Sequence, residues 1–177
     1  MYKLRELQKE DITIINMWRS KRELIEKLEA PYRYINLETE YKWYENYLNN
    51  RGNTIRCAIV EEKNEDNILG LVSLINVNTI NRSATFHIMI GEQHNRRKGL
   101  GLFAANEILK HGFSDMNLNR IELTVLETNI PAIKLYEIVG FKKEGIKRKS
   151  IYKEGKYVNT IMMAVLKDEY KTIIERN

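Results

Sequence analysis

The sequence predicts a single α+β domain over residues 1–177, with a mixed, mainly antiparallel sheet flanked by helices. Three stretches rich in Ile, Val and Leu, residues 54–60, 68–78 and 83–90, are separated only by short polar turns, which indicates three consecutive antiparallel strands. After them a helical apolar pattern leads into another strand, which a crossover connection makes parallel to the third. We find no internal repeat and no linker in the sequence.

The N-terminal part is predicted to be a short strand followed by helices. Residues 2–7 read as the strand, and Asp11 is placed as the N-cap of the first helix. One side of this helix is apolar: Ile12, Ile15 and Trp18. A second helical stretch over 21–29 ends before Pro31, because a residue before proline is pushed out of the helical region. A further helix is predicted from residues spaced by four and three: Leu37, Tyr41, Tyr44 and Leu48.

The C-terminal half is predicted to alternate helix and strand. After the third strand and a basic loop, a helix is expected from an apolar stripe: Leu100, Phe103, Ala104, Ile108 and Gly112. Residues 120–125 alternate as a strand does. Pro131 in the first turn and Gly140 as the C-terminal cap mark a short helix. Phe141 onward and residues 157–166 then form a closing hairpin.

Composition indicates an ordinary globular protein of a reducing compartment. Apolar residues make up 43% of the chain and charged residues 30%. The lone Cys57 excludes an internal disulfide, and one cysteine with three scattered histidines gives no zinc-type spacing, so we expect no bound metal. No apolar stretch is long enough for a signal peptide or a membrane span. We therefore expect a cytoplasmic protein without a membrane partner.

The net charge of +5 suits a nucleic acid, an anionic membrane surface or a polyphosphate ligand. Positive residues concentrate at 96–98 and from 142 to 156, whereas residues 23–45 contain six glutamates. This distribution favours a local anionic ligand over a long nucleic acid, and no nucleic-acid-binding motif accompanies the basic clusters. A basic nucleic-acid module without chemistry is kept as the alternative class.

The basic loop before the fourth predicted helix is the most informative segment. It reads Arg96-Arg97-Lys98-Gly99-Leu100-Gly101 and lies between a strand and the start of a helix. A helix N-terminus offers unpaired N–H groups and a positive dipole end, and glycines let a phosphate approach the main chain. Arginine and lysine add charge and donors for phosphate oxygens. The segment therefore predicts a pyrophosphate site, with a solvated capping loop as the alternative.

With this loop the sequence resembles the GNAT superfamily of N-acetyltransferases, whose acetyl-CoA loop follows the pattern Gln/Arg-x-x-Gly-x-Gly/Ala. A second family pattern, Asn-x-x-Ala-x-x-x-Tyr-x-x-x-Gly-Phe, is met by Asn129, Ala132, Tyr136, Gly140 and Phe141. The resemblance covers nearly the whole chain, and the sequence patterns resemble those of the RimJ/RimL and spermidine acetyltransferase branch. It implies acetyl-CoA as co-substrate and a V-shaped gap between two strands that accepts the pantetheine arm.

The resemblance also implies roles for single residues. Tyr136 would be the general acid, because a phenol of pKa near ~10 can give a proton to a thiolate whose conjugate acid is near ~8.5. Asn129 would contact the coenzyme, with an ordinary N-cap role as the alternative. The backbone at Ile88, Met89 and Ile90 would face the oxyanion of the tetrahedral intermediate.

The catalytic base is where the sequence departs from the family pattern. Many relatives have a glutamate on the strand before the phosphate loop, and the corresponding residue here is Thr85, which accepts no proton at neutral pH. His87 points to the same side of the strand, and its intrinsic pKa near ~6.5 suits a base. A purely structural His87, a water chain to Glu122 and an amine that is already neutral are the alternatives.

The acceptor is expected to be a primary amine, and three classes of amine are candidates. The glutamates of the N-terminal helices favour a polyamine, and Glu29-Ala30-Pro31-Tyr32 resembles a stretch of spermidine acetyltransferases. The residues predicted to contact the acceptor are Glu29, Tyr32 and Thr85. Met17-Trp18-Arg19 resembles acetyltransferases of amino sugars and aminoglycosides. The N-terminal amine of a protein is the third candidate acceptor. A non-catalytic acyl-CoA-binding protein is kept as an alternative because the glutamate on the strand is missing. The oligomeric state is left open, with a homo-oligomer as one possibility.

Overall fold

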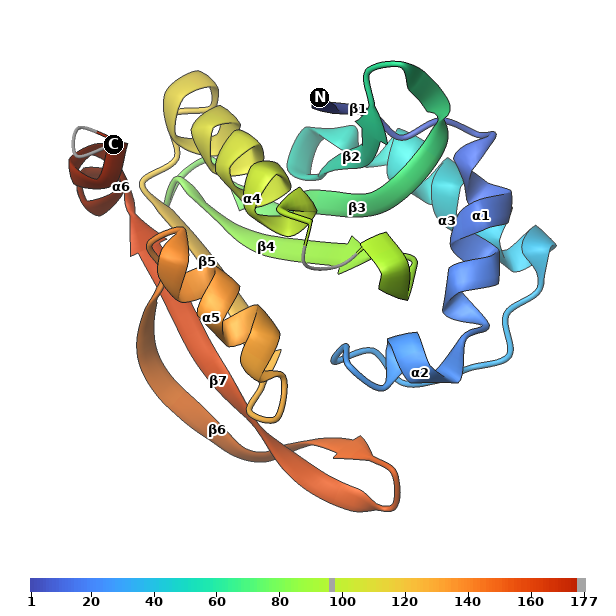
Figure 1. Cartoon of the computed structure of the whole chain (residues 1–177). Helices are drawn as coiled ribbons and strands as arrows, with labels where there is room; N and C mark the ends of the chain where they lie inside the picture. Colours follow the sequence, from blue (N-terminus) through green and yellow to red (C-terminus); the bar gives the residue numbers. More distant parts are fainter. Residues whose placement is uncertain (96–97, 175–177) are drawn as a thin grey trace.

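The structure is a computed structural model that describes residues 1–95 and 98–174, without the side chains of 171–174. Within these residues one seven-stranded sheet has the order β1-β2-β3-β4-β5-β7-β6 (Figure 1). β4 and β5 are parallel, and every other neighbouring pair is antiparallel. The predicted α+β class with a mixed, mainly antiparallel sheet is therefore confirmed.

The strands are β1 (Tyr2–Glu6), β2 (Ile55–Glu61), β3 (Asn64–Asn78), β4 (Ser83–Ile90), β5 (Arg120–Leu126), β6 (Lys142–Lys153) and β7 (Lys156–Leu166). The α-helices are α1 (Asp11–Arg19), α2 (Arg22–Ile25), α3 (Leu37–Asn49), α4 (Leu100–Lys110), α5 (Ile130–Ile138) and α6 (Lys167–Ile174). Short 3₁₀ turns occupy Arg51–Asn53 and Gln93–Asn95, and a π-helical turn over His111–Asp115 extends α4. In the part of the chain that the structure describes, none of these helices combines the length and apolar character of a membrane span.

Helices cover the two faces of the sheet unequally. On one face, here called the α4/α5 face, α4 and α5 pack on apolar strand residues; the buried members include Leu74, Phe86, Ala104, Ile108, Leu123 and Ile133. On the other, the α1/α3 face, helices cover the β1–β4 half; the buried members include Ile12, Ile15, Trp18, Tyr47, Ala58 and Val60. Each face of the sheet thus has its own apolar cluster.

Strand register assigns the functional side chains to these faces. Directly paired residues of neighbouring strands point to the same face of a sheet. Arg56 pairs with Ser73, and Ser73 pairs with His87, so these three form one row on the α1/α3 face. Phe86 and Ile88 alternate to the α4/α5 face. The predicted active-site strand therefore presents different residues to the two sides.

The start of α1 differs from the prediction. Glu10 is the N-cap residue, and Asp11 is the first residue of the helix. The Asp11 carboxylate accepts two hydrogen bonds of 2.8 Å from the Arg5 guanidinium and one of 2.8 Å from the Gln8 N–H. Asp11 is buried because this pairing replaces its water, and the pair joins β1 to α1.

The apolar stripe predicted for α3 is not its most buried side. Leu37 and Leu48 are 37% and 43% exposed, whereas Glu40 is 0% exposed and Tyr47 is also buried. Glu40 forms an ion pair of 2.9 Å with Arg19 of α1. Apolar periodicity cannot find a core position that a carboxylate fills, because the position depends on a cation from another helix.

Gly91 fixes how α1 meets the end of β4. A Cβ at this position would lie 2.0 Å from Cε2 of Trp18, so only glycine fits beneath the indole. The Trp18 indole N–H donates a 3.2 Å hydrogen bond to Glu92, which also pairs with Lys21 at 2.6 Å. The helix thus holds in place the strand end that leads into the basic loop.

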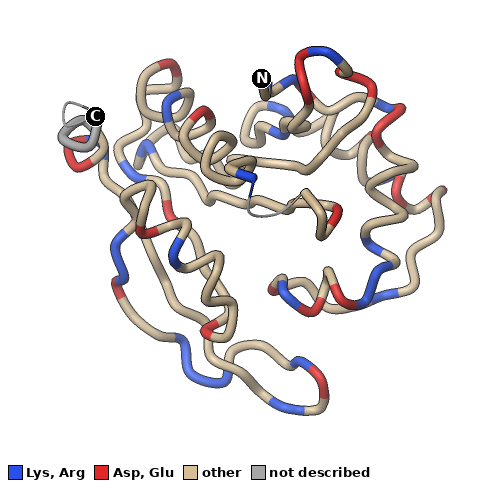
Figure 2. Tube along the Cα trace, in the orientation of Figure 1, with Lys and Arg blue, Asp and Glu red and all other residues tan. Residues whose placement is uncertain are grey.

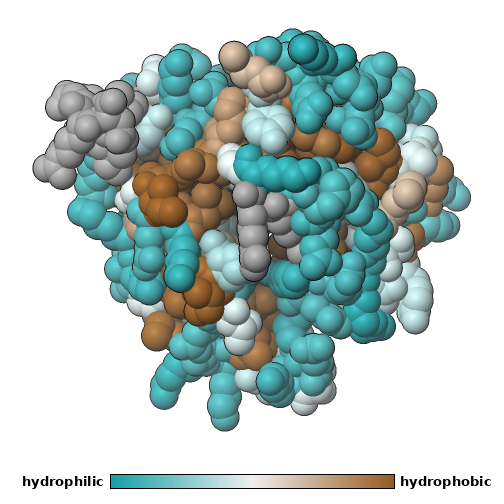
Figure 3. Space-filling model, viewed as in Figure 1, coloured by the Kyte–Doolittle hydropathy of each residue, from teal (hydrophilic) through white to brown (hydrophobic). Residues whose placement is uncertain are grey.

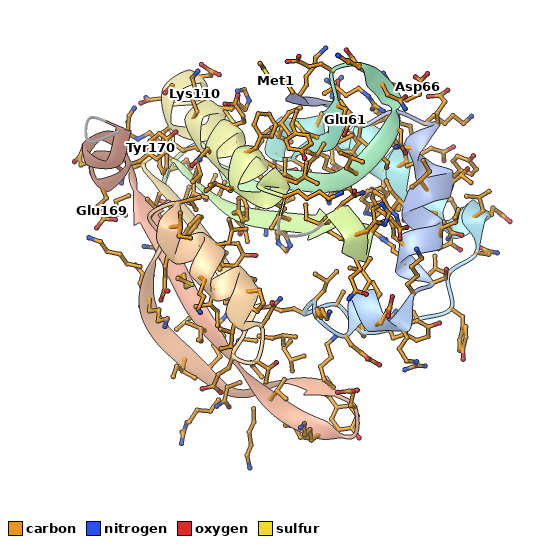
Figure 4. The ribbon with its side chains drawn as sticks, viewed as in Figure 1. Met1, Glu61, Asp66, Lys110, Glu169 and Tyr170 are labelled. Carbon is orange, nitrogen blue, oxygen red and sulfur yellow. The ribbon has the colours of Figure 1, made fainter. Side chains whose placement is uncertain are left out.

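The far end of the sheet is closed by α6. Tyr170 lies on this helix (Figure 4), and its ring packs 4.9 Å from that of Phe113 in the π-helical turn. Its neighbour Glu169 pairs with Lys142 of β6 at 2.6 Å. These contacts connect α4, β6 and α6 at a distance from the strand gap described below.

Candidate active site

The first feature of the site is the separation of two parallel strands. β4 and β5 pair at Ser83 with Arg120, at Ala84 with Ile121 and at Thr85 with Glu122, and the register ends there. Figure 1 shows the two strands leaving a common region and running apart. The predicted V-shaped gap is present. Past Thr85 the edge of β4 that faces β5 has no strand partner among the described residues, so its backbone groups need other partners.

The predicted oxyanion residues lie on this unpaired edge. Ile88, Met89 and Ile90 pair on their other side with Val72, Leu71 and Gly70 of β3. Pairing with β3 therefore fixes the position and direction of this part of β4. A backbone held in this way presents N–H and C=O groups at set positions along the gap, as a linear amide-containing ligand requires.

The start of α4 forms the second feature. Gly99 is its N-cap residue and has φ of +79°, a left-handed conformation that favours glycine. A Cβ at Gly99 would meet nothing within 4 Å, so the space before the helix is open, whereas one at Gly101 would lie 3.1 Å from Leu135 of α5. Lys98 is exposed and Leu100 is buried as an anchor. Arg96 and Arg97 lie outside the described residues.

Tyr136 of α5 stands on the α4/α5 face of the gap. Its ring is 8% exposed and meets Phe86 of β4 and Phe141 edge-on, at 5.8 and 5.9 Å between centroids. Burial, followed by the charge of Glu29, raises the pKa of the Tyr136 phenol well above its usual value of 10. The phenol therefore stays protonated at neutral pH and holds a proton on this side of the gap.

Asn129 joins α5 to the N-terminal part of the chain. Its side-chain carbonyl accepts a hydrogen bond of 3.4 Å from the Ala132 N–H, which is the N-cap contact. Its amide donates a 2.9 Å hydrogen bond to the carbonyl of Lys27. The N-cap role is observed, and the predicted contact with the coenzyme stays a prediction.

The predicted helix over 21–29 is wrong beyond its first turn. α2 covers only Arg22–Ile25, and residues 26–30, here called the α2 loop, continue without regular structure. The ammonium group of Lys153, at the end of β6, donates hydrogen bonds of 2.9 Å to the Ile25 carbonyl and 2.5 Å to the Ala30 carbonyl. Lys153 thus ties both ends of the α2 loop to the end of β6.

The α2 loop places the Glu29 carboxylate at the gap. The Thr124 hydroxyl of β5 donates a 2.7 Å hydrogen bond to Oε2 of Glu29. Oε1 of Glu29 is buried and has no hydrogen-bond partner among the described residues. Thr124 lies two residues past the last β4–β5 pair and points to the α1/α3 face, level with His87 across the gap. A carboxylate thus reaches the gap from an element other than β4.

His87 and Glu122 are the two base candidates on the same face. Desolvation, and then the positive charge of Arg56, lower the pKa of the His87 imidazole, so this residue is neutral at pH 7. Glu122 accepts a hydrogen bond of 3.0 Å from Arg120, which also pairs with Glu144. His87 is therefore available to a ligand in the gap, whereas the Glu122 carboxylate is already occupied.

Tyr32 is held away from the other predicted acceptor residues. Its hydroxyl donates a 3.3 Å hydrogen bond to the Ser20 carbonyl, and the Arg22 guanidinium lies 4.1 Å from its ring centroid. Tyr34 packs edge-on against it at 5.5 Å. Within the described residues these contacts keep Tyr32 against the start of α2, so its role in acceptor binding stays a prediction.

Two residues of the site escaped the sequence reasoning. Thr124 looked like any other alternating strand residue, and Lys153 looked like a turn residue of the closing hairpin. Neither carries a local signal, because each acts on a segment about a hundred positions away along the chain. Among the described residues no group of three His, Cys, Asp or Glu side chains is placed to hold a metal ion.

Surface character differs between the sides of the gap. Figure 3 shows apolar residues gathered over α4 and α5, where Leu102, Ile130 and Ile138 are exposed. Figure 2 shows Lys and Arg along β6 and its hairpin, and mixed charges over α1–α3. A split sheet, an open helix N-terminus and a protonated tyrosine beside an apolar surface are together the parts of a coenzyme-A-dependent acetyltransferase.

Comparison with known proteins gives the family. The model of the GNAT acetyltransferase domain matches residues 2–142. The chain is 32% identical over 168 residues to the spermidine N(1)-acetyltransferase of Vibrio cholerae serotype O1, covering 94% of each chain, and 28% identical over 170 residues to that of Escherichia coli K12, covering 95% and 87%. The crystal structure of a Vibrio cholerae spermidine N-acetyltransferase in complex with CoA and spermine superposes with a TM-score of 0.89 at 28% identity, covering 96% and 98%.

The chain therefore belongs to the GNAT acetyltransferase family. It is an N-acetyltransferase, and acetyl-CoA is its acetyl donor.

Proposed function

We propose that this enzyme transfers an acetyl group from acetyl-CoA to a primary amine of a polyamine such as spermidine. The observation that carries the proposal is the Glu29 carboxylate, which lies at the gap with one buried oxygen that no described residue pairs. A buried carboxylate of this kind calls for a cation or a proton. The relatives named as spermidine acetyltransferases supply the class of cation.

The coenzyme is assigned to the α4/α5 face. The residues proposed to hold its pyrophosphate are Arg96, Arg97, Lys98, Gly99, Leu100 and Gly101, with Asn129 as a further contact. The open space at Gly99 and the dipole of the eleven-residue helix α4 support this placement. The pantetheine arm would extend along the unpaired edge of β4 at Ile88–Ile90.

The chemistry follows from what meets at the gap. The neutral amine attacks the thioester carbonyl, so a C–N bond forms while the carbonyl oxygen takes negative charge that backbone N–H groups of β4 stabilise. Collapse breaks the C–S bond, and the departing thiolate takes the proton of Tyr136. The surplus proton of the amine passes to a base on the α1/α3 face. His87 is our candidate, because its lowered pKa keeps it unprotonated.

The acceptor is assigned to the α1/α3 face, opposite Tyr136. Glu29 would hold an ammonium group of the acceptor, and Thr85 lies where the two strands part, within the same face. The amine would attack from this face, and Tyr136 would protonate the thiolate from the other. The nucleophile and the leaving group would therefore lie on opposite sides of the sheet. Tyr32 would act only if the segment before α3 turned inward.

We also propose that residues 1–177 form one catalytic domain that acts in the cytoplasm. The strands from residues 2 to 166 join a single sheet, which supports one domain. Burial, followed by the charge of Glu6, raises the pKa of the Cys57 thiol to about 11, so this lone cysteine stays a protonated thiol at neutral pH.

Release of free thiol from acetyl-CoA in the presence of spermidine tests the proposal. Glu29→Gln keeps the shape of the side chain and removes its charge. We expect the KM for spermidine to rise about 10- to 100-fold, because one charge-assisted hydrogen bond contributes this much to binding. Glu23→Gln removes an equal charge from exposed α2 and is the matched control, with a KM like that of the wild type. Equal effects of both variants would show a general charge effect and overturn the placement of the acceptor.

A further inference from the structure

Glu92, the second residue after β4, receives hydrogen bonds from two elements of the acceptor side. Its Oε1 accepts one of 3.2 Å from the indole N–H of Trp18, in the last turn of α1, and one of 2.6 Å from the ammonium group of Lys21, the N-cap residue of α2. The hydrogen bond from Lys21, against a smaller effect of burial, lowers the pKa of the Glu92 carboxyl. One carboxylate oxygen therefore joins α1, α2 and the end of β4.

The backbone around Glu92 is held on several sides. A Cβ at Gly91 would lie within 2.5 Å of three atoms of the Trp18 indole, so the chain passes directly beneath the ring. The Gly91 N–H donates a 3.0 Å hydrogen bond to the Leu69 carbonyl of β3, and the Asn95 N–H donates one of 3.1 Å to the Glu92 carbonyl. These contacts, together with the carboxylate, set the direction in which the chain leaves the sheet.

The contact lies between the two proposed substrate sites. On one side the chain continues from Asn95 into the proposed coenzyme residues 96–101, where α4 begins after Gly99. On the other side the Lys21 carbonyl accepts hydrogen bonds of 3.0 and 3.2 Å from N–H groups of α2, and the loop after α2 carries Glu29. Glu92 is thus connected through short segments to both sites.

Charge alone does not explain a glutamate at this position. Glu92 precedes a segment proposed to bind an anion, and a negative charge there by itself disfavours the coenzyme. The side chains of Lys21 and Glu92 are 36% and 35% exposed, and an ion pair of such exposure adds little to stability. The Trp18 side chain, in contrast, is 1% exposed, so its N–H would be left buried without a partner if Glu92 were absent.

We propose that Glu92 is a positioning residue that holds the coenzyme segment and the acceptor-side helices in one arrangement. The inference rests on the proposed function in placing the coenzyme at residues 96–101 and the acceptor at Glu29. It goes further in assigning a contribution to the affinity for both substrates to a residue that contacts neither of them.

Glu92→Leu separates position from charge, because the two predict opposite results for acetyl-CoA. Removal of the carboxylate leaves Lys21 unpaired and the region more positive, so electrostatics alone would strengthen binding of the anionic coenzyme. Loss of position weakens binding. We expect the Kd for acetyl-CoA, measured by equilibrium binding, to rise about 5- to 20-fold, because one charge-assisted and one neutral hydrogen bond are lost. An unchanged or lower Kd would overturn the proposal.

Glu65→Leu is the matched control. Glu65 belongs to the β2–β3 hairpin and pairs with Lys3 at 2.8 Å, and both side chains are partly exposed, as in the pair of Glu92 with Lys21. The variant changes the charge by the same amount and breaks the same kind of ion pair. We expect its Kd for acetyl-CoA to equal that of the wild type. Equal losses of affinity in the two variants would show a general effect and contradict a positioning role.

The conservative variant gives a second readout. Glu92→Gln keeps an oxygen that accepts from Trp18 and Lys21 and loses only the charge, so its Kd for acetyl-CoA should stay within about twofold of the wild type. A Kd as high as that of Glu92→Leu would assign the effect to charge and overturn the proposal. Should Glu92→Leu fail to fold, Trp18→Phe decides. It removes the N–H donor without a change of charge, and we expect its Kd to rise about 2- to 5-fold, whereas an unchanged value would contradict the role of this contact.

Steady-state kinetics of the same variants test the link to the acceptor. With spermidine, Glu92→Leu is expected to raise the KM of both substrates while kcat stays within about twofold, whereas a loss of folded protein would lower kcat alone. A lowered kcat at unchanged KM values would overturn the proposal. Failure of the proposed function gives a different result. If the wild type releases no thiol with any amine, the Kd for acetyl-CoA in Glu92→Leu and Glu65→Leu still decides whether Glu92 positions the coenzyme segment.

Discussion

The two sides of the split sheet differ in how their residues are distributed along the chain. The proposed coenzyme side is built from two short segments, residues 96–101 and 129–141, each of which can be read as a pattern. The acceptor side is built from contacts between distant positions: Glu29 with Thr124, Lys27 with Asn129 and Ile25 with Lys153. A ligand that a whole family shares can be bound by a local sequence motif, whereas a particular acceptor is bound by residues that only the assembled fold brings together.

The largest expected effect concerns the coenzyme side. Gly99→Glu places a carboxylate at the open N-terminus of α4 and adds a side chain at φ of +79°. Like charge against a pyrophosphate costs several kcal/mol, so we expect acetyl-CoA affinity to fall about 1,000-fold, measured by equilibrium binding. Gly155→Glu has the same charge and a similar φ of +81° in the β6–β7 turn, and it controls for backbone strain. Equal losses in the two variants would contradict the loop assignment.

The next effect separates binding from chemistry. Tyr136→Phe removes only the hydroxyl, and the contacts of the ring with Phe86 and Phe141 remain. Loss of a general acid is expected to lower kcat about 100-fold or more while acetyl-CoA affinity stays within about twofold. Steady-state thiol release and equilibrium binding measure the two quantities. A fully active variant would remove Tyr136 from the mechanism.

A smaller effect tests whether the α2 loop positions the acceptor. Lys153→Met fills similar volume but releases the carbonyls of Ile25 and Ala30. Two lost hydrogen bonds loosen the loop, so the KM for the amine should rise about 5- to 20-fold with kcat and coenzyme affinity little changed. Lys156→Met, exposed in the same hairpin, is the control. A fall in kcat alone would mean that the loop acts on the chemical step instead.

The smallest effect is a shift in pH dependence. The pKa of His87 is lowered from 6.5, so the imidazole is unprotonated above this lowered value and becomes charged as the pH falls through it. If His87 is the base, the acid limb of the kcat/KM profile has its midpoint below pH 6.5 and disappears in His87→Gln. An unaltered acid limb in that variant assigns the base to another group.

Sequence patterns were sufficient for the framework and for half of the site. The strands, the parallel crossover and the helix that carries Tyr136 follow from periodicity and turn residues, and the gap was implied by the family resemblance that the two motifs carry. These features depend on neighbours within a few positions, which is the range that such patterns sample. The α4 start at Gly99 was found for the same reason.

The failures have a common physical origin. The first helix was given the wrong N-cap because Asp11 pairs with Arg5, and the stripe predicted for α3 missed the buried Glu40, which Arg19 neutralises. The second helix was drawn too long, and the cation of Lys153 binds the carbonyls of Ile25 and Ala30 at the two ends of the α2 loop. In each case a charged residue from a distant element overrode a local structural preference, and the local sequence does not indicate that partner.

Thiol release from acetyl-CoA with spermidine, compared between the wild type, Glu29→Gln and Tyr136→Phe, tests most directly that amine and coenzyme meet at this gap from opposite faces. We predict release by the wild type, a raised KM for spermidine in Glu29→Gln, and a lowered kcat at unchanged coenzyme affinity in Tyr136→Phe. Binding of acetyl-CoA without thiol release for spermidine or any other primary amine, or identical kinetics in all three proteins, would contradict the account.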